Sequence, residues 1–206
     1  MTRPPPTTRS EPERRFLTGT APKLTGRTIS SYAAKFNVRS ENMGTVASPI
    51  YEIIQPGAFD GRLNDDVRAL FNHDNNLILA RSKNGRESLG LKIDATGLFY
   101  QLEAPNTTAG NDLLESIRRG DVDQSSFSFS VAPGGDAWRA EGQGMVRTIT
   151  KLEQLFDCSP VVSPAYGTTT VTARHKPAGA PATRPGEHPT IQQARHRLNL
   201  LEMTNH

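Results

Sequence analysis

The chain has 206 residues, one cysteine and a formal net charge of +3. This length allows one domain of roughly 150 residues with extended ends. The single cysteine, Cys158, excludes an internal disulfide and a zinc site built from cysteines. No apolar run approaches the roughly 18 residues that a membrane-spanning helix needs, and the N-terminus lacks a signal-peptide core. We therefore expect a soluble, intracellular protein with no membrane partner.

The positive charge lies at the two ends of the chain. Residues 1–27 carry six basic and two acidic side chains, and residues 172–206 carry five basic and two acidic ones. The residues between them have 13 basic and 17 acidic side chains, a balance of −4. Because a nucleic-acid reader needs a basic surface on its folded domain, we do not expect the central domain to bind nucleic acid.

Composition divides the chain into four regions. Residues 1–25 are rich in Pro, Thr and Arg and have little to bury, which predicts a disordered N-terminal tail. Residues 26–174 have the pattern of a folded domain. Residues 175–190 are rich in Pro, Ala and Gly, as is typical of a linker. In residues 191–206 apolar side chains recur at helical spacing, which predicts a small amphipathic helix that needs a partner.

The folded region is predicted to be mostly β. Short segments rich in β-branched and aromatic residues recur between turn signals. The predicted strands cover residues 27–36, 51–56, 67–73, 77–81, 86–93, 97–104, 126–131, the segment around Trp138, 145–150, 152–162 and 168–173. A brief helix is expected at 58–63, and one main helix at 109–119. The expected fold class is therefore mostly β (α+β): a curved sheet or β-barrel of short strands with one main helix, plus flexible tails.

The main helix leads directly into a strand of alternating serines. Thr107 or Thr108 is a suitable N-cap for this helix, and Gly120 suits its left-handed end. In the strand that follows, Ser126, Ser128 and Ser130 share one face, and Phe127, Phe129 and Val131 share the other. Two interpretations stay open at this point. The strand is either half-buried with its hydroxyls facing water, or it carries a nucleophile.

A serine nucleophile needs a neighbouring base, usually an imidazole. Four of the five histidines lie beyond the folded region, at positions 175, 188, 196 and 206, so elimination leaves His73 within it. It ends a predicted strand, where functional groups are often exposed. Taken alone, however, a histidine at a strand end is more often structural or incidental.

Asp157 is the candidate for the group that orients the base. It interrupts the apolar run Leu155–Val162, and a carboxylate there is costly to bury unless it is paired or hydrogen-bonded. The competing interpretation is an edge-strand aspartate that faces water.

The chain also resembles a known family, in an ordered series of short motifs. The matching segments are Ile50–Phe59 (family pattern E-x-I-x-P-G-A-F), Val67–Asp74 (V-R-x-L-x-N-H-D), Ile78–Arg81 (V-L-G-R), Gly97-Leu98, Arg119–Val122, Gln124–Phe129 (x-M-S-F-G-F) and Phe156–Tyr166 (x-[DE]-V-S-P-V-T-x-P-A-Y). Together they resemble the prohead, or capsid-maturation, serine proteases of tailed phages, which are distantly similar to the herpesvirus assemblin proteases. The resemblance implies an assemblin-like fold.

The resemblance assigns roles to three residues. It implies that Ser126 is the nucleophile, that His73 is the base and that Asp157 is the acidic member, with no cofactor and no metal ligand. Two departures crowd the site with hydroxyls, because Ser125 replaces the family's usual Met and Ser128 its usual Gly.

Two further features concern the surroundings of these residues. Cys158 replaces the family's usual Val, and strand alternation points it away from Asp157, so we expect a small buried residue without a catalytic role. The motifs identify no oxyanion-hole donors; the backbone of Gly134-Gly135 is one candidate.

The resemblance also implies a function, a setting and partners. It implies a serine endopeptidase that cleaves segments of the scaffold and the major capsid protein, and its own ends, in the assembling prohead within the host cytoplasm. The portal and a second copy of the chain are further candidate partners. The alternative is a non-catalytic capsid or scaffold component that keeps the protease fold. A metal hydrolase is disfavoured, because His73-Asp74 is the only His/carboxylate pair in the expected folded region.

Overall fold

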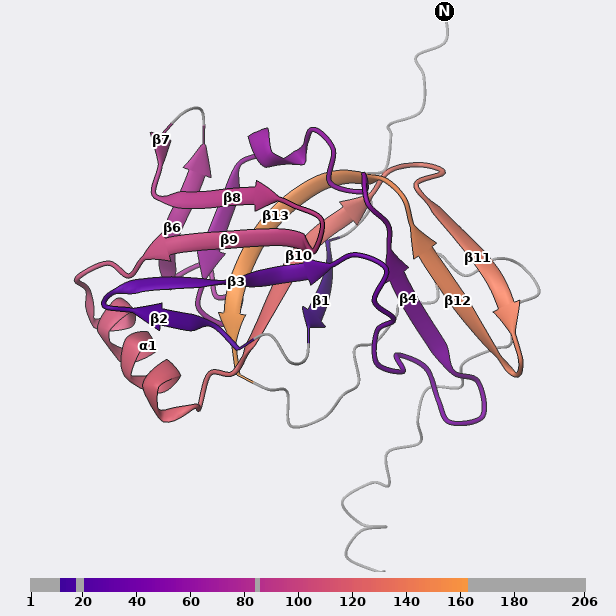
Figure 1. The fold of residues 1–206 in the computed structure, drawn as a ribbon, viewed down its shortest axis with the longest axis horizontal. Helices are drawn as coiled ribbons and strands as arrows, with labels where there is room; N and C mark the ends of the chain where they lie inside the picture. Colours follow the sequence, from indigo (N-terminus) through magenta and orange to yellow (C-terminus); the bar gives the residue numbers. More distant parts are fainter. Residues whose placement is uncertain (1–11, 18–20, 84–85, 163–206) are drawn as a thin grey trace, which may run out of the picture. The chain divides into compact units, whose positions relative to one another are not determined.

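The structure is a computed structural model that describes residues 12–17, 21–83 and 86–162 (Figure 1). These residues form thirteen strands, one α-helix and one short 3-10 helix. The strands form three sheets, none of which closes into a barrel. The prediction of a mostly β fold with one main helix is therefore confirmed, and the sheets are open. The strand predicted at 168–173, the linker and the C-terminal helix lie outside the described residues.

A six-stranded sheet carries the serine strand. Its order is β1 (Glu13–Leu17), β10 (Gln124–Val131), β13 (Leu152–Val161), β5 (Val67–Leu70), β6 (Ile78–Lys83) and β7 (Arg86–Glu87). β13 pairs with β5 in parallel, and the other neighbours are antiparallel. This order puts β10 and β13 side by side, so the strands that carry Ser126 and Asp157 are neighbours.

Two smaller sheets complete the described fold. The four-stranded sheet is antiparallel, in the order β2 (Lys23–Thr25), β3 (Thr28–Lys35), β9 (Gly97–Glu103) and β8 (Leu89–Ile93). The three-stranded sheet has the order β11 (Asp136–Glu141), β12 (Gly144–Ile149) and β4 (Ile50–Ile54), with β12 and β4 parallel. The strands of the four-stranded sheet cross those of the six-stranded one, and β3 contacts β10 (Figure 1).

The helix α1 (Thr108–Arg119) begins and ends where the sequence predicts. The Thr107 side chain caps it by accepting a hydrogen bond from the Gly110 backbone N–H at 3.2 Å. Gly120 ends it in the left-handed conformation, with φ 81°. Leu113 and Leu114 on its inner face are buried. The 3-10 helix η1 (Arg62–Asn64) replaces the brief helix that was expected at 58–63.

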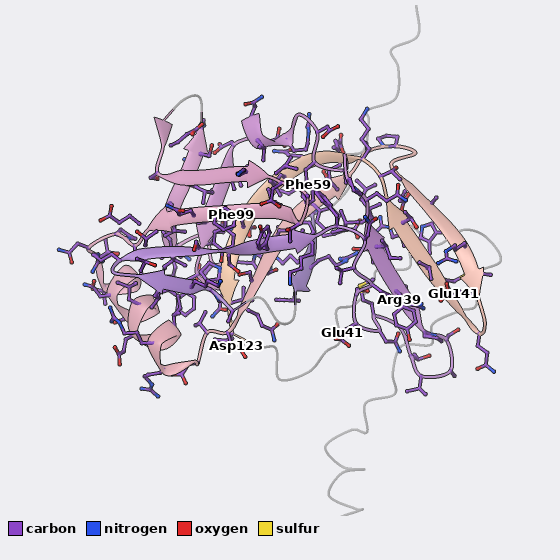
Figure 2. The ribbon with its side chains drawn as sticks, viewed as in Figure 1. Arg39, Glu41, Phe59, Phe99, Asp123 and Glu141 are labelled. Atoms are coloured by element: carbon purple, nitrogen blue, oxygen red, sulfur yellow. The ribbon has the colours of Figure 1, made fainter. Side chains whose placement is uncertain are left out.

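The core lies on the aromatic face of β10. Phe127 and Phe129 stack with ring centroids 4.8 Å apart, and Phe59, labelled in Figure 2, lies 5.7 Å from Phe127. All three are at most 2% exposed. Full burial of such a side chain contributes about 1.5–3 kcal/mol. This packing holds β10 at the centre of the described fold.

The structure differs from the sequence prediction at the N-terminal end. The expected disordered tail at 1–25 contains β1 and β2. β1 has too few apolar residues to signal a strand. It is held instead by pairing along the edge of β10 and by ion pairs of Arg15 and Glu13 with Glu52 and Arg147. These contacts join residues far apart in the chain, so local composition does not reveal them.

Candidate active site

Ser126, His73 and Asp157 come from three segments and contact one another in a row. The Nε2 atom of His73 lies 2.6 Å from Oγ of Ser126, and its Nδ1 atom lies 2.6 Å from Oδ1 of Asp157. Their exposed fractions are 0% for Ser126, 7% for His73 and 6% for Asp157. The structure therefore brings together all three residues that were predicted from the sequence. It buries them, whereas a position facing water had been one interpretation for the serines and for Asp157.

His73 lies in a turn and not in the strand that was predicted to reach it. β5 ends at Leu70, and Asn72 and His73 have φ values of 53° and 59°. Non-glycine residues with such left-handed backbone cost on the order of 1 kcal/mol each. The turn is tied to the end of β13, because Asn72 N–H donates to Pro160 O and Val162 N–H donates to the Asn72 side chain. The turn is thus held beside β13, and His73 contacts both Ser126 and Asp157.

The three neighbouring serines occupy different environments. Ser125 alternates to the aromatic face of β10, where its Oγ lies 2.9 Å from the buried Tyr100 hydroxyl. Ser128 lies opposite Asp157 in the pairing of β10 with β13. Ser126 is the one whose Oγ is hydrogen-bonded to the imidazole. Alternation predicts this division of faces, but the burial of both faces depends on the other elements.

Asp157 lies on an internal strand and accepts two hydrogen bonds. β13 lies between β10 and β5, which excludes the edge-strand interpretation. Besides His73, the Ser159 hydroxyl donates to Oδ1 of Asp157 at 2.7 Å, and Ser159 Oγ accepts from the Leu70 N–H at 3.3 Å. Ser159 was missed by the sequence analysis. The available signal was its spacing of two residues from Asp157, which places both on one face.

Cys158 and the Gly134-Gly135 pair lie away from these groups. Cys158 belongs to the core cluster, and burial raises the pKa of its thiol well above the ordinary value, which disfavours a thiolate. Its predicted burial is confirmed. The Gly135 N–H donates to Ala132 O within a turn beyond the end of β10. At about 3.4 Å per residue, this turn is more than about 15 Å along the strand from Ser126, so it is not placed to serve as an oxyanion hole.

A surface pocket opens beside the imidazole. Its volume is about 240 Å³. It is lined by His73, Asp157 and Ser128, together with Pro12, Arg14, Asp66, Arg68, Leu70, Asn75, Gln154 and Phe156. Hydrogen bonding from Arg81 holds the pKa of the Asp66 carboxyl well below its usual range. Asp66 therefore keeps a negative charge at the edge of the pocket, beside the cations Arg81 and Lys83. The pocket gives solvent-sized groups access to the His73–Asp157 side of the site.

Strand β1 covers Ser126. Phe16 lies opposite Ser126 in the pairing of β1 with β10, and the Ser126 hydroxyl donates to the Arg15 carbonyl at 2.8 Å. Sequence reasoning missed this contact, and also the buried partners of Arg15 described below.

Within 12–17, 21–83 and 86–162, no group of three or more His, Cys, Asp or Glu side chains is arranged to hold a metal ion. In the same part of the chain, no helix has the length and apolar character needed to cross a membrane.

A comparison with known protein families covers most of this chain. Residues 18–180 match the family described as caudovirus prohead serine protease. The chain belongs to this family. Membership places it among the serine proteases of phage capsid maturation, and all three side chains of the row lie within the matched residues. β1 lies before them.

The chain is also distantly similar to a protein of known structure. Among solved structures, the chain is similar to the bacteriophage T4 capsid assembly protease, gp21, with 10% sequence identity and a TM-score of 0.47. The similarity covers 75% of this chain and 100% of that chain. No curated protein sequence matches this chain.

Proposed function

We propose that this prohead protease is an active serine endopeptidase in which Ser126 is the nucleophile, His73 the general base and Asp157 the group that orients the base. The observation that carries the proposal is the pair of 2.6 Å contacts of the two His73 ring nitrogens, one with Ser126 and one with Asp157. A nucleophile, a base and an orienting carboxylate within hydrogen-bond reach are the signature of this chemistry.

The proposed reaction is acyl transfer. With Asp157 ionised, His73 donates its Nδ1–H to the carboxylate and leaves Nε2 free to accept the Ser126 proton. The alkoxide then attacks a peptide carbonyl, and the imidazolium gives its proton to the leaving amine. Water, deprotonated by the same imidazole, hydrolyses the acyl-enzyme. Asp157 stabilises the imidazolium throughout and transfers no proton itself.

Ser159 is a positioning residue in this proposal. Its hydroxyl donates to the same Asp157 oxygen that faces His73, and its Oγ is anchored by the Leu70 N–H. A hydrogen bond to an ionised carboxylate is worth about 1.5–3 kcal/mol. Ser159 thereby keeps the carboxylate directed at the imidazole.

The proposed substrates are segments of the scaffold and the major capsid protein, together with the ends of the protease itself. Family membership supports capsid proteins as substrates, because the family is one of prohead proteases. The Pro-, Ala- and Gly-rich composition of residues 175–190 is typical of a linker, and it supports self-cleavage there because linkers are preferred sites of proteolysis. Intact-mass measurement over time tests this. Loss of the C-terminal residues should require Ser126, and loss in a Ser126→Ala chain free of other proteases would contradict it.

The rival function is a non-catalytic capsid or scaffold component with the same fold. A fluorophosphonate probe separates the two, because it reacts only with an activated serine. The proposal expects covalent labelling that maps to Ser126 and is lost in Ser126→Ala. Ser128→Ala is the matched control, since it removes a hydroxyl from the same face and strand. A folded chain that is labelled neither as wild type nor as Arg15→Glu, a change in the strand that covers Ser126, would favour the rival, as would equal labelling of the Ser126→Ala variant.

A further inference from the structure

Strand β1 lies where a peptide substrate of the proposed reaction has to lie. It pairs antiparallel with β10 at the edge of the six-stranded sheet, with Arg15 opposite Phe127 and Phe16 opposite Ser126. The Arg15 carbonyl oxygen is 2.8 Å from Oγ of Ser126. Many peptide-binding proteins take an extended peptide as an added edge strand, in which backbone hydrogen bonds supply affinity and alternate side chains supply specificity. β1 has this geometry, but it belongs to the chain itself.

The contact with Arg15 competes with activation of the serine. A hydroxyl has one hydrogen, and the Arg15 carbonyl and the unprotonated Nε2 of His73 are both acceptors. While the carbonyl takes that hydrogen, the imidazole cannot. With β1 in place Ser126 is fully buried, and no other peptide carbonyl can reach its Oγ. β1 therefore holds the site in a closed, unreactive arrangement.

Two side chains of β1 are fastened in a buried charge cluster. Arg15 donates to both carboxylate oxygens of Glu52 on β4, at 2.8 and 2.9 Å. Glu13, two residues earlier and therefore on the same face, accepts from Arg147 on β12 at 2.6 and 3.0 Å. Arg147 also donates to Asp136 at 2.6 Å. The charge cluster, defined as Glu13, Arg15, Glu52, Asp136 and Arg147, thus joins β1 to all three strands of the smallest sheet.

Without β1, the cluster keeps Glu52, Asp136 and Arg147, and their charges favour particular residues in a strand that replaces β1. Glu52 and Asp136 carry two negative charges against the single positive charge of Arg147. Glu52 would keep only a 3.2 Å contact with Arg147 among the ion pairs of the cluster. Its side chain is 3% exposed with β1 in place, and a buried charge without a partner is costly. The vacated position therefore favours a strand with a basic residue in place of Arg15, whereas an acidic residue two positions earlier matches Arg147.

We propose that β1 is an internal occupant of the substrate-binding edge of β10, and that substrates bind in its place as an antiparallel strand. On this view a basic substrate residue takes the position of Arg15 against Glu52, and an acidic one takes that of Glu13 against Arg147. The proposal rests on the proposed function of the Ser126 site. β1 also precedes the residues 18–180 that match the family.

A binding experiment tests the proposal without requiring catalysis. The probe is a fluorescein-labelled peptide Pro-Glu-Arg-Arg-Phe-Leu, the sequence of residues 12–17, and the protein is the full chain with Ser126→Ala. Adding Arg15→Glu to that chain should loosen β1 and tighten peptide binding at least about tenfold in fluorescence anisotropy. Lys23→Glu is the matched control, because it makes the same charge change at an exposed site outside β1. Equal affinity of the Arg15→Glu and control chains for the peptide would overturn the occupancy of the edge by β1.

The peptide sequence tests the charge preference. A peptide with Glu in place of its second Arg should bind the Arg15→Glu chain at least about tenfold more weakly, because it meets Glu52. Equal affinity of the two peptides would overturn the role of the charge cluster. Arg15→Ala is the second variant if the charge reversal disturbs folding, with thermal unfolding as the check.

Reaction with a fluorophosphonate separates this proposal from the proposed function. In chains that keep Ser126, Arg15→Glu should be labelled faster than the wild type and than Lys23→Glu. Equal, measurable labelling in all three would overturn the covering role of β1 and leave the serine protease intact. Peptide binding that depends on Arg15, with no labelling in any chain, would support the edge site and contradict catalysis.

Discussion

The Nε2 atom of His73 lies 2.6 Å from Oγ of Ser126, although the two residues are 53 positions apart in the chain. The contact exists because a left-handed turn at Asn72 and His73 is anchored to the end of β13. β13 pairs in turn with the strand that carries Ser126. The same arrangement places Asp157 against the other ring nitrogen.

Replacing Asp157 by Asn should lower kcat strongly while the fold is kept. The amide is close in size to the carboxylate, but it neither stabilises the imidazolium nor favours the tautomer with hydrogen on Nδ1. We expect a loss of about 10⁴-fold with residual activity. Peptide hydrolysis measures it, with circular dichroism as the control for folding. An Asp157→Asn enzyme with unchanged kcat would exclude Asp157 as the orienting group.

Replacing Ser159 by Ala should lower activity less than loss of Asp157, because Ser159 acts through that carboxylate. Loss of a hydrogen bond to a charged group, about 1.5–3 kcal/mol, predicts a decrease of roughly ten- to a hundredfold. Because the lost bond orients the carboxylate towards His73 and contacts no substrate, the decrease should fall on kcat and leave KM little changed. Ser159→Thr, which keeps the hydroxyl, should restore kcat. A decrease that falls on KM, or that threonine does not reverse, would indicate a structural role only.

Replacing Arg147 by Met should destabilise the protein. Its side chain is 1% exposed and pairs with Glu13, Glu52 and Asp136, so the change removes a buried cation that three carboxylates share. Glu13 and Glu52 keep Arg15 as a partner. Removing one partner of a buried pair costs about 3–5 kcal/mol. Denaturant unfolding measures the loss. The matched control is Arg118→Met, whose pair with Glu115 is exposed and should change stability by less than about 0.5 kcal/mol. Equal effects of the two variants would contradict the cluster's contribution.

Acid should weaken the ion pair between Glu13 and Arg147, which attaches β1 to the smallest sheet. Burial raises the pKa of Glu13, but the Arg147 hydrogen bond and the charges of Arg15 and Arg147 outweigh it, so its folded-state pKa lies below the ordinary value of 4.5. A lowered folded pKa contributes stability above pH 4.5, and this stability is lost as pH falls through the lower folded value. Between pH 6 and pH 3, the unfolding free energy should fall more for the wild type than for Glu13→Gln. Parallel pH profiles would contradict the linkage.

Local patterns predicted much of the fold and the identity of the site residues. Thr107 and Gly120 mark the ends of α1. The Thr107 side chain accepts a hydrogen bond from an N–H of the first turn, and Gly120 adopts the left-handed conformation that ends the helix. Period-two alternation placed Ser126 on one face of β10 and Phe127 on the other. Elimination pointed to His73, the interrupted apolar run pointed to Asp157, and the family resemblance implied a role for each. The structure brings both together with Ser126.

Only the tertiary structure decided what surrounds those residues. Ser125 bonds to Tyr100 inside the core, and Ser159 bonds to Asp157 next to the imidazole. The hydrogen bond from Ser126 to the Arg15 carbonyl joins residues 111 positions apart. A short charged segment such as β1 has no propensity that marks it as a strand. It is ordered by an open sheet edge and by buried counter-charges, and these exist only once distant strands have packed.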